Sequence, residues 1–371
     1  MKKIIRTSTV PVSLKGLLKG QLRMLSKHYT VVGVSSCGEA LEQLVAQEGV
    51  EVRAINMERK ISIFKDIKSL FCMIALLRKE RPDIVHSITP KAGLITMLAA
   101  KIVGVPVRVH TFTGLIFPTA RGFKQKLLIA MDRLLCRCAT NIYPEGSGVK
   151  KALVDYKITS KPLKVIANGN VNGIDVGYFD PTNFEKNEDD IFRFVFIGRM
   201  VGDKGINELA DAFMRLNAKY PQTELVLVGN FEHELDPLKP ETKNIIDTHK
   251  AINFVGYQSD VRPFLAASDA FVFPSYREGF PNVVMQAGAM GLPQIVTDIN
   301  GCNEIIIEGK NGVIIPPQDA NALYDTMEIF IASPDEVANM ARTAREMIIS
   351  RYEQSLVWEA ILEEYKLLLG E

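Results

Sequence analysis

Two cations and one carboxylate in the second half of the chain are the residues best suited to chemistry. Arg199 and Lys204 flank a short turn, and Glu278 stands beside Gly279 in a loop. Arg binds a phosphate through a bidentate fork and Lys through a point charge, so together they suit a diphosphate. The alternative is a surface ion pair between Arg199 and Asp203. We favour the diphosphate, because Glu278 is expected in the same place.

The elements around these residues would bring them to one edge of a parallel sheet. A strand at 192–197 leads to Arg199, and a strand at 269–273 leads to Glu278 before a helix begins near Pro281. Ligands of open α/β sheets bind at the carboxyl ends of the strands, where the free N–H groups of a helix start favour anions. We therefore predict a nucleotide-diphosphate pocket, with Glu278 holding a polar part of the ligand.

The alternation of strands and helices predicts an α/β protein with two Rossmann-like domains facing a cleft. A turn-rich and charged stretch at 168–190 is typical of a linker, so we predict domains at 1–183 and 184–371. The expected strands are 4–8, 29–34, 50–55, 83–86, 107–110, 141–143, 163–166, 192–197, 223–228, 252–255, 269–273 and 294–296.

Length and composition are those of a globular protein with sizeable cores. The chain has 371 residues, of which 47% are hydrophobic and 23% charged. No apolar run approaches the roughly 20 residues of a membrane-spanning helix, and the first residues are typical of a strand and not of a signal peptide. The cysteines are scattered without zinc-site spacing, which favours reduced thiols in a cytoplasm.

The net charge of +1 hides two halves of opposite sign. Residues 1–180 hold 28 Lys and Arg against 13 Asp and Glu, whereas residues 181–371 hold 16 against 30. A basic domain without nucleic-acid motifs is predicted to face an anionic membrane or a phosphate-bearing substrate, and no nucleic-acid partner is expected. The alternative is that the two halves attract each other across the cleft.

Several short motifs of the second half occur together. They are Gly198-Arg199, Lys204-Gly205, Gly256-Tyr257, Pro-Ser-Tyr-Arg-Glu-Gly-Phe-Pro at 274–281 and Gly-Cys-Asn-Glu at 301–304. This combination resembles the retaining glycosyltransferases of the GT-B fold, family four, and the likeness extends over nearly the whole chain. Residues 9–14 and 89–93 resemble the branch that builds capsule, O-antigen or glycan chains on a lipid carrier. The family implies C-terminal helices that pack back toward the N-terminal domain, the last at 354–370.

The resemblance implies roles for the residues of the donor pocket. Arg199, Lys204 and Glu278 would be catalytic: the two cations would hold the phosphates and stabilise the leaving diphosphate. Glu278 matches the first acid of the family's Glu-x7-Glu motif and would contact hydroxyls of the donor sugar. Gln286 replaces the second acid, and its carbonyl can still accept from the ribose, with Glu304 as an alternative ribose ligand. The other donor-binding residues are Gly198, Phe280, Pro281, Asn282 and Val283, the last four through backbone amides.

The acceptor side is expected in the N-terminal half. Family members often carry a His-Gly pair there, but this chain has Thr113 before Gly114. His110 lies earlier and is predicted to be a structural histidine inside a strand. His86 ends another strand and is predicted to face the cleft. The predicted acceptor-side residues are Ser8, Thr9, His86, Thr113 and Gly114.

No arrangement of residues suggests a protein nucleophile or a metal site. There is no Gly-x-Ser-x-Gly elbow and no Asp-x-Asp pair, and His233 is expected in a solvated loop. The resemblance implies that the leaving phosphate accepts the proton of the acceptor hydroxyl, with Arg199 and Lys204 in place of a metal. We therefore expect neither a cofactor nor a bound metal.

A contact with the membrane is predicted for the basic half. An apolar run at 115–118 precedes Arg121, Lys124, Lys126, Arg133 and Arg137, and Lys15, Lys19, Arg23 and Lys27 lie on the first helix. Apolar side chains beside basic ones suit the surface of an anionic bilayer, whereas the alternative is an ordinary amphipathic helix with a solvated basic face. The expected location is cytoplasmic, peripheral on the inner face of the cytoplasmic membrane.

The leading hypothesis is a metal-independent retaining glycosyltransferase. Its expected donor is a UDP-sugar such as a UDP-N-acetylhexosamine, and its expected acceptor is a lipid-linked saccharide. One alternative is a sugar-nucleotide epimerase of the same fold, against which the sparse supply of His and carboxylate groups argues. The other is a non-catalytic member that binds a sugar nucleotide or glycan, which the departures at Gln286 and Thr113 keep open.

Overall fold

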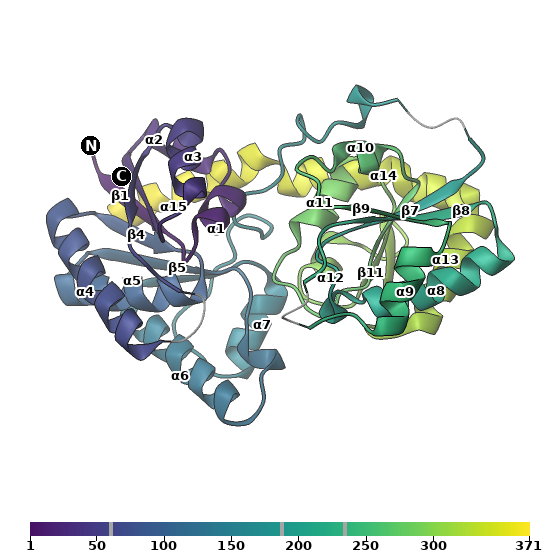
Figure 1. Ribbon diagram of the computed structural model, residues 1–371. Helices are drawn as coiled ribbons and strands as arrows, with labels where there is room; N and C mark the ends of the chain where they lie inside the picture. The colour runs from purple at the N-terminus through teal and green to yellow at the C-terminus, as the bar shows by residue number, and fades with distance from the viewer. Residues whose placement is uncertain (59–61, 186–188, 233–235) are drawn as a thin grey trace. The chain divides into compact units, whose positions relative to one another are not determined.

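The computed structural model describes residues 1–58, 62–185, 189–232 and 236–371. The chain forms two compact units (Figure 1). The first unit comprises Met1–Gly173 together with Gln354–Glu371, and the second comprises Ile174–Glu353. Each unit contains its own parallel sheet of six strands, which confirms the predicted α/β fold with two Rossmann-like domains.

The sheet of the first unit has the strand order β3-β2-β1-β4-β5-β6, and all its neighbours are parallel. Successive residues such as Ile4 and Ile5 are both fully buried, because helices cover both faces of the sheet. The strands are β1 (Lys3–Thr7), β2 (Thr30–Ser35), β3 (Glu51–Ala54), β4 (Ile84–Ser87), β5 (Val107–Phe112) and β6 (Asn141–Pro144). The strand predicted at 163–166 forms only a single bridge, between Ile142 and Leu163.

Two layers of helices enclose this sheet. Ile5 and Val85 pack against the layer formed by α4 (Ile63–Glu80), α5 (Pro90–Val103), α6 (Gly122–Cys138) and α7 (Ser147–Asp155). Ile4 and Ile84 pack against the opposite layer, formed by α1 (Pro11–Leu17), α2 (Gln21–Ser26), α3 (Glu39–Glu48) and α15 (Gln354–Leu369). A 3-10 turn, η1 (Phe117–Thr119), precedes α6.

The second unit repeats this architecture. Its sheet has the order β12-β11-β10-β7-β8-β9, so the strand order reverses between β10 and β7. The strands are β7 (Phe192–Ile197), β8 (Thr223–Val228), β9 (Ile252–Gly256), β10 (Ala270–Phe273), β11 (Gln294–Thr297) and β12 (Gly312–Ile315). The helices are α8 (Ile206–Lys219), α9 (Pro240–Thr248), α10 (Arg262–Ala266), α11 (Asn282–Ala289), α12 (Cys302–Ile305), α13 (Ala320–Ala332) and α14 (Pro334–Tyr352), with 3-10 turns η2 (Pro181–Asn183) and η3 (Gly202–Lys204).

The structure moves the predicted domain boundary from 183/184 to Gly173/Ile174. The reason is packing: the Ile174 N–H donates to the Tyr352 carbonyl, and Phe179 joins the core of the second unit. Residues after Gly173 therefore belong to the second unit although their composition is that of a linker. The helix α15 belongs to the first unit, because Val357, Ile361 and Tyr365 join its core.

Candidate active site

Two loops of the second unit meet at the carboxyl ends of β7 and β10. The first carries Lys204 in η3, and the second carries Glu278. Gly205 holds them together: it has a φ of +72°, and a Cβ atom there would lie 2.1 Å from the Pro274 carbonyl oxygen. Only glycine allows this contact between backbones. The Tyr276 N–H also donates to the Asp203 carbonyl over 2.8 Å.

Lys204 and Glu278 form an ion pair between these loops. The Lys204 ammonium donates to Glu278 Oε1, and the Ser275 hydroxyl donates to the same oxygen over 3.0 Å. Both side chains are largely buried, with exposed fractions of 15% and 18%. The ammonium also lies 5.3 Å from the centre of the Phe273 ring. The structure thus brings together the two residues that the sequence placed in one pocket.

Arg199 lies on the same edge of the sheet with half of its side chain exposed. Its guanidinium pairs with the Glu232 carboxylate, not with Asp203, so the predicted alternative of an Arg199–Asp203 pair is wrong. Asp203 accepts instead from Arg277 Nη2 over 2.8 Å. Sequence reasoning missed Glu232 as a partner, because its place after β8 becomes relevant only once β7 and β8 are known to be neighbours.

The helix α11 begins directly behind the Glu278 loop. Its N-cap residue, Pro281, provides no side-chain hydrogen bond to the first turn. Phe280 is buried and packs against Tyr352, with ring centres 5.4 Å apart, so this residue offers a ligand its backbone rather than its side chain. A helix start next to a Lys and an Arg is a favourable place for a diphosphate.

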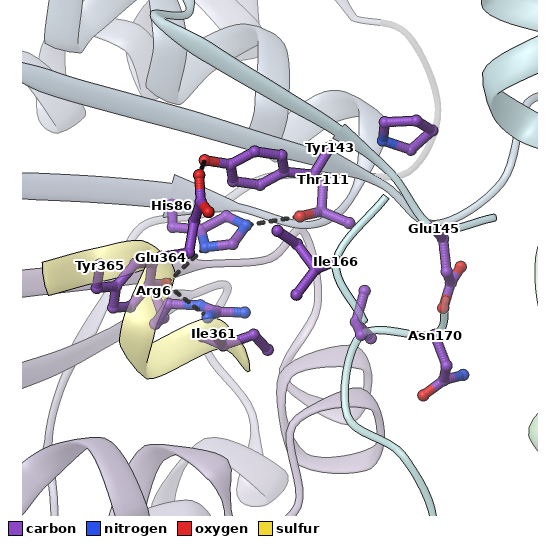
Figure 2. Close-up of a pocket in the computed structure, with 12 residues that line it drawn as sticks. Arg6, His86, Thr111, Tyr143, Glu145, Ile166, Asn170, Ile361, Glu364 and Tyr365 are labelled. Atoms are coloured by element: carbon purple, nitrogen blue, oxygen red, sulfur yellow. Dashed lines mark hydrogen bonds between the residues drawn. The ribbon is translucent and has the colours of Figure 1, made fainter. Parts of the chain in front are cut away.

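In the first unit, His86 does not lie in an open cleft as predicted. It is 4% exposed and forms a buried hydrogen-bond chain (Figure 2). The Arg6 Nη1 group donates to the Tyr365 hydroxyl over 2.8 Å; His86 Nδ1 lies 2.6 Å from that hydroxyl, and His86 Nε2 lies 2.7 Å from the Thr111 hydroxyl. Burial and the neighbouring Arg6 hold the pKa of His86 well below its usual value. The imidazole is therefore neutral at pH 7.

A pocket adjoins this chain under α15, which carries Glu364 and Tyr365 (Figure 2). The Tyr143 hydroxyl donates to Glu364 Oε1 over 2.6 Å, and Lys164 pairs with the same carboxylate. Arg6 is 1% exposed, and its Nε has no hydrogen-bond partner within the described parts of the chain. The sequence signal that could have identified this network is Arg6 itself, a charged residue inside an otherwise buried strand.

The remaining predicted acceptor-side residues lie in loops at the carboxyl edge of the same sheet. The Thr113 hydroxyl donates to the Ile88 carbonyl over 2.7 Å, and Gly114 adopts a φ of +144°. The Ser8 hydroxyl donates to the Val10 carbonyl, and Thr9 bonds the Thr89 hydroxyl. These bonds connect the loops after β1, β4 and β5.

His110 is a structural residue of the core. It is 1% exposed, bonds the Ser87 hydroxyl over 2.8 Å, and has its pKa lowered to about 3 by burial. A Cβ atom at Gly93 would lie 2.5 Å from its Cε1, so α5 presses directly on the ring. The histidine is therefore closed to a substrate.

Comparisons with known proteins identify the family. Residues 21–169 match the glycosyl transferase 4-like domain, and residues 191–333 match glycosyl transferases group 1. The capsular polysaccharide biosynthesis glycosyltransferase CapM of Staphylococcus aureus is 31% identical over 378 residues, covering 100% of this chain and 98% of that protein. This chain is a glycosyltransferase of family four. The resemblance seen in the sequence is thereby confirmed.

Two further similarities agree with this assignment. An Escherichia coli protein, the UDP-Gal:alpha-D-GlcNAc-diphosphoundecaprenol alpha-1,3-galactosyltransferase, is 29% identical over 309 residues, covering 79% of this chain and 78% of that protein. The Anabaena protein HepE in complex with UDP superposes with a TM-score of 0.81 at 19% identity, covering 99% of this chain and 100% of that chain. The second similarity shows that the fold is GT-B.

In this glycosyltransferase, Gln286 lies on the second turn of α11 and is half-buried. Its side chain has no hydrogen-bond partner in the described segments of the chain. Glu304 lies in α12, where its carbonyl accepts from Arg351 Nη1 and from the Tyr352 hydroxyl, each over 3.1 Å. Its backbone is thus fixed against α14.

The described residues contain no group of three or more His, Cys, Asp or Glu side chains placed to hold a metal ion. His233 lies outside the described residues. Within the part of the chain that the structure describes, no helix combines the length and apolarity needed to cross a membrane.

Proposed function

We propose that the protein is a retaining, metal-independent glycosyltransferase that moves a sugar from a UDP-sugar to a lipid-linked saccharide in surface polysaccharide or glycan synthesis. The observation that carries the proposal is the Lys204–Glu278 pair between β7 and β10, beside Arg199 and the start of α11. Ligands of open α/β sheets bind where the strand order reverses, which here is between these two strands.

The donor would be held mainly through its charge. Arg199 and Lys204 would bind the two phosphates, with Gly198 and the backbone of Phe280, Pro281, Asn282 and Val283 alongside. Glu278 would exchange its bond to Lys204 for hydroxyls of the donor sugar. Gln286 would accept from the ribose, with Glu304 as the alternative. The UDP bound by HepE and the UDP-Gal in the name of the Escherichia coli relative support a UDP-sugar, for which a UDP-N-acetylhexosamine is our specific candidate.

The reaction would proceed without a covalent bond between the sugar and the protein. The acceptor oxygen bonds to the anomeric carbon on the face from which the diphosphate departs, and the carbon–oxygen bond to the phosphate breaks. The hydroxyl proton passes to the departing phosphate oxygen, whose negative charge Arg199 and Lys204 stabilise. The neutral, buried state of His86 and His110 supports this route, because neither offers a base to a substrate.

The acceptor would approach the first unit through the loops with Ser8, Thr9, Thr113 and Gly114. His86 would not contact the acceptor and would only support these loops through its hydrogen bond with Thr111. The diphosphoundecaprenol in the relative's name and the capsule role in the name of CapM support a lipid-linked acceptor. The protein would then work on the inner face of the cytoplasmic membrane as a peripheral protein.

The decisive experiment incubates purified protein with UDP-N-acetylglucosamine, UDP-galactose or UDP-glucose and a short-chain lipid-diphosphate saccharide. We expect transfer from one donor, an α-linked product by NMR, and no loss of rate with EDTA. The same donor should raise the melting temperature, since a ligand stabilises the state that binds it. Interconversion of the UDP-sugar without an acceptor would indicate an epimerase, and binding without turnover a non-catalytic member; either outcome would overturn the proposal.

A further inference from the structure

The helix α4 has two apolar faces. Met73, Ile74 and Leu77 point into the core of the first unit and are buried. On the other side, Phe64 and Phe71 are 89% and 66% exposed. Phe64, Ile67 and Phe71 follow each other at the spacing of one helix face, with Lys68 among them. A row of large apolar side chains in solvent usually marks an interaction site.

The helix α6 shows the same pattern. Phe123 is 81% exposed, and Leu127 and Leu134 follow on the same side with exposed fractions of 37% and 41%. Its inner side contributes Leu135 and Cys136 to the core. Two helices of one layer therefore both turn an apolar stripe outward.

The two stripes belong to one surface. The helix α5 packs against both α4 and α6, so the three lie side by side in one layer (Figure 1). Each of these helices follows a strand of a parallel sheet, so its N-terminus lies at the carboxyl edge of that sheet. Phe64 and Phe123 both lie in the first helical turn, and so they lie at this edge. We call Ile63, Phe64, Ile67, Phe71, Phe123 and Leu127 the α4–α6 face.

The charge around this face is positive. Lys68, Arg121, Lys124, Lys126 and Arg137 are exposed and form no ion pair with any carboxylate among the residues the structure describes. Two nearby acids are already paired: Asp66 with Lys91, and Glu58 with Lys65. Apolar side chains at headgroup depth with unpaired cations around them are what an anionic bilayer binds.

We propose that the α4–α6 face docks the protein on an anionic membrane, with Phe64, Phe71 and Phe123 inserted at the interface. This inference rests on the proposed function in one respect: a lipid-linked acceptor would reach the loops with Thr113 and Gly114 from the same edge. A second copy of the chain is the weaker occupant, because two such faces would bring unpaired cations together.

The structure also corrects the patch expected from the sequence. Phe117, the largest side chain of the apolar run at 115–118, is fully buried, which leaves Ile116 and Pro118 as the exposed residues of that run. The first helices, with Lys15 and Lys19, pack on the opposite face of the sheet. The apolar part of the membrane contact therefore comes from α4 and from Phe123.

The test measures binding of the full chain to vesicles of phosphatidylglycerol and phosphatidylcholine by flotation. We expect Phe64→Ser/Phe71→Ser to lower vesicle affinity by about tenfold or more, and Phe123→Ser by a smaller factor. Lys124→Gln/Lys126→Gln should lower affinity and weaken its dependence on salt. The matched control is Leu367→Ser, which removes an equally exposed apolar side chain, 69% exposed, from α15.

Equal affinity of the wild type and the phenylalanine variants, or no binding of the wild type at low salt, would overturn the inference. A change of oligomeric state in the phenylalanine variants without vesicles would overturn it in favour of a second copy. Transfer to a short-chain, water-soluble acceptor separates this inference from the proposed function. The phenylalanine variants should keep the wild-type rate in that assay, whereas absent transfer with intact vesicle binding would refute the proposed function alone.

Discussion

The two units share one strand order but differ in how deeply they bury their charged side chains. Counted within each unit, both sheets have the order 3-2-1-4-5-6. At the carboxyl edge of the second unit, Lys204 pairs with Glu278 and Arg199 pairs with Glu232, and all of these side chains keep some exposure to solvent. In the first unit, the ionisable groups at mid-sheet, Arg6 and His86, are sealed under α15. The same fold thus places charged groups at a partly exposed edge in one unit and buries them in the other.

The largest effect is expected from Lys204→Ala. If Lys204 stabilises a leaving diphosphate, the transfer rate should fall by about 10²–10³-fold, the usual loss for one group that stabilises developing charge. Steady-state transfer assays check this. Lys243→Ala, which removes another cation of the second unit from α9, should leave the rate unchanged. A Lys204→Ala enzyme with the wild-type rate would show that this charge of the second unit has no part in catalysis.

The burial of charge in the first unit can be tested through Asp132 on α6. Burial raises the pKa of its carboxyl to about 7. The folded protein therefore keeps the proton between pH 4 and 7 while the unfolded chain loses it, so stability falls as the pH rises through this window. Asp132→Asn removes this loss, and its stability advantage should grow to roughly 2–4 kcal/mol by pH 8.

Urea denaturation at about pH 4.5 and about pH 8 measures the free energy of unfolding of both proteins. The variant and the wild type should be close at the lower pH and clearly separated at the higher one. A constant difference at both values would mean that the carboxyl is ionised in the folded protein, and the contrast between the units would not extend to α6.

A somewhat smaller loss is expected from Tyr365→Phe. The variant leaves Arg6 and His86 without the hydroxyl they share, and an unsatisfied buried polar group costs about 1–3 kcal/mol. Thermal unfolding should show a lower melting temperature. Tyr29→Phe provides the control, because its hydroxyl bonds the exposed Glu371 over a longer distance of 3.3 Å. Equal losses in the two variants would show that the buried chain has no special role.

The smallest effect concerns the ion pair that occupies Arg199 before a ligand arrives. Replacing Glu232 by Gln frees the guanidinium, and since an exposed pair is worth at most about 1 kcal/mol, UDP should bind roughly two- to fivefold more tightly. Titration calorimetry measures this. Weaker binding instead would assign Glu232 a direct role in holding the nucleotide.

The sequence allowed β1 to β11, the α11 helix and the meeting of Lys204 with Glu278 to be predicted. It missed β12 and added a strand at 163–166, where the structure has only a single bridge. Carboxyl ends of neighbouring parallel strands share one edge, so loops far apart in the sequence can be placed together. It could not give the partner of Arg199, because Glu232 reaches it through packing and not through spacing. It also placed His86 in an open cleft, because the helix that covers it, α15, lies far along the chain.

The outward phenylalanines of α4 escaped prediction for a different reason. Periodicity detects an apolar face but does not distinguish the face toward the core from a second one toward solvent. The boundary at Gly173 was missed because a turn-rich composition indicates a loop. It does not reveal that the few apolar residues of this loop join the core of the second unit. Phe179, inside the predicted linker, is one such residue.

The return of α15 to the first unit has a consequence for synthesis on the ribosome. The second unit is one continuous segment, Ile174–Glu353, and can complete its fold as soon as that segment emerges. The first unit cannot complete its fold before residues 354–369 are made, so Arg6 and His86 are not covered by α15 while the whole second unit is translated. The half of the protein that is made first is thus the half that matures last.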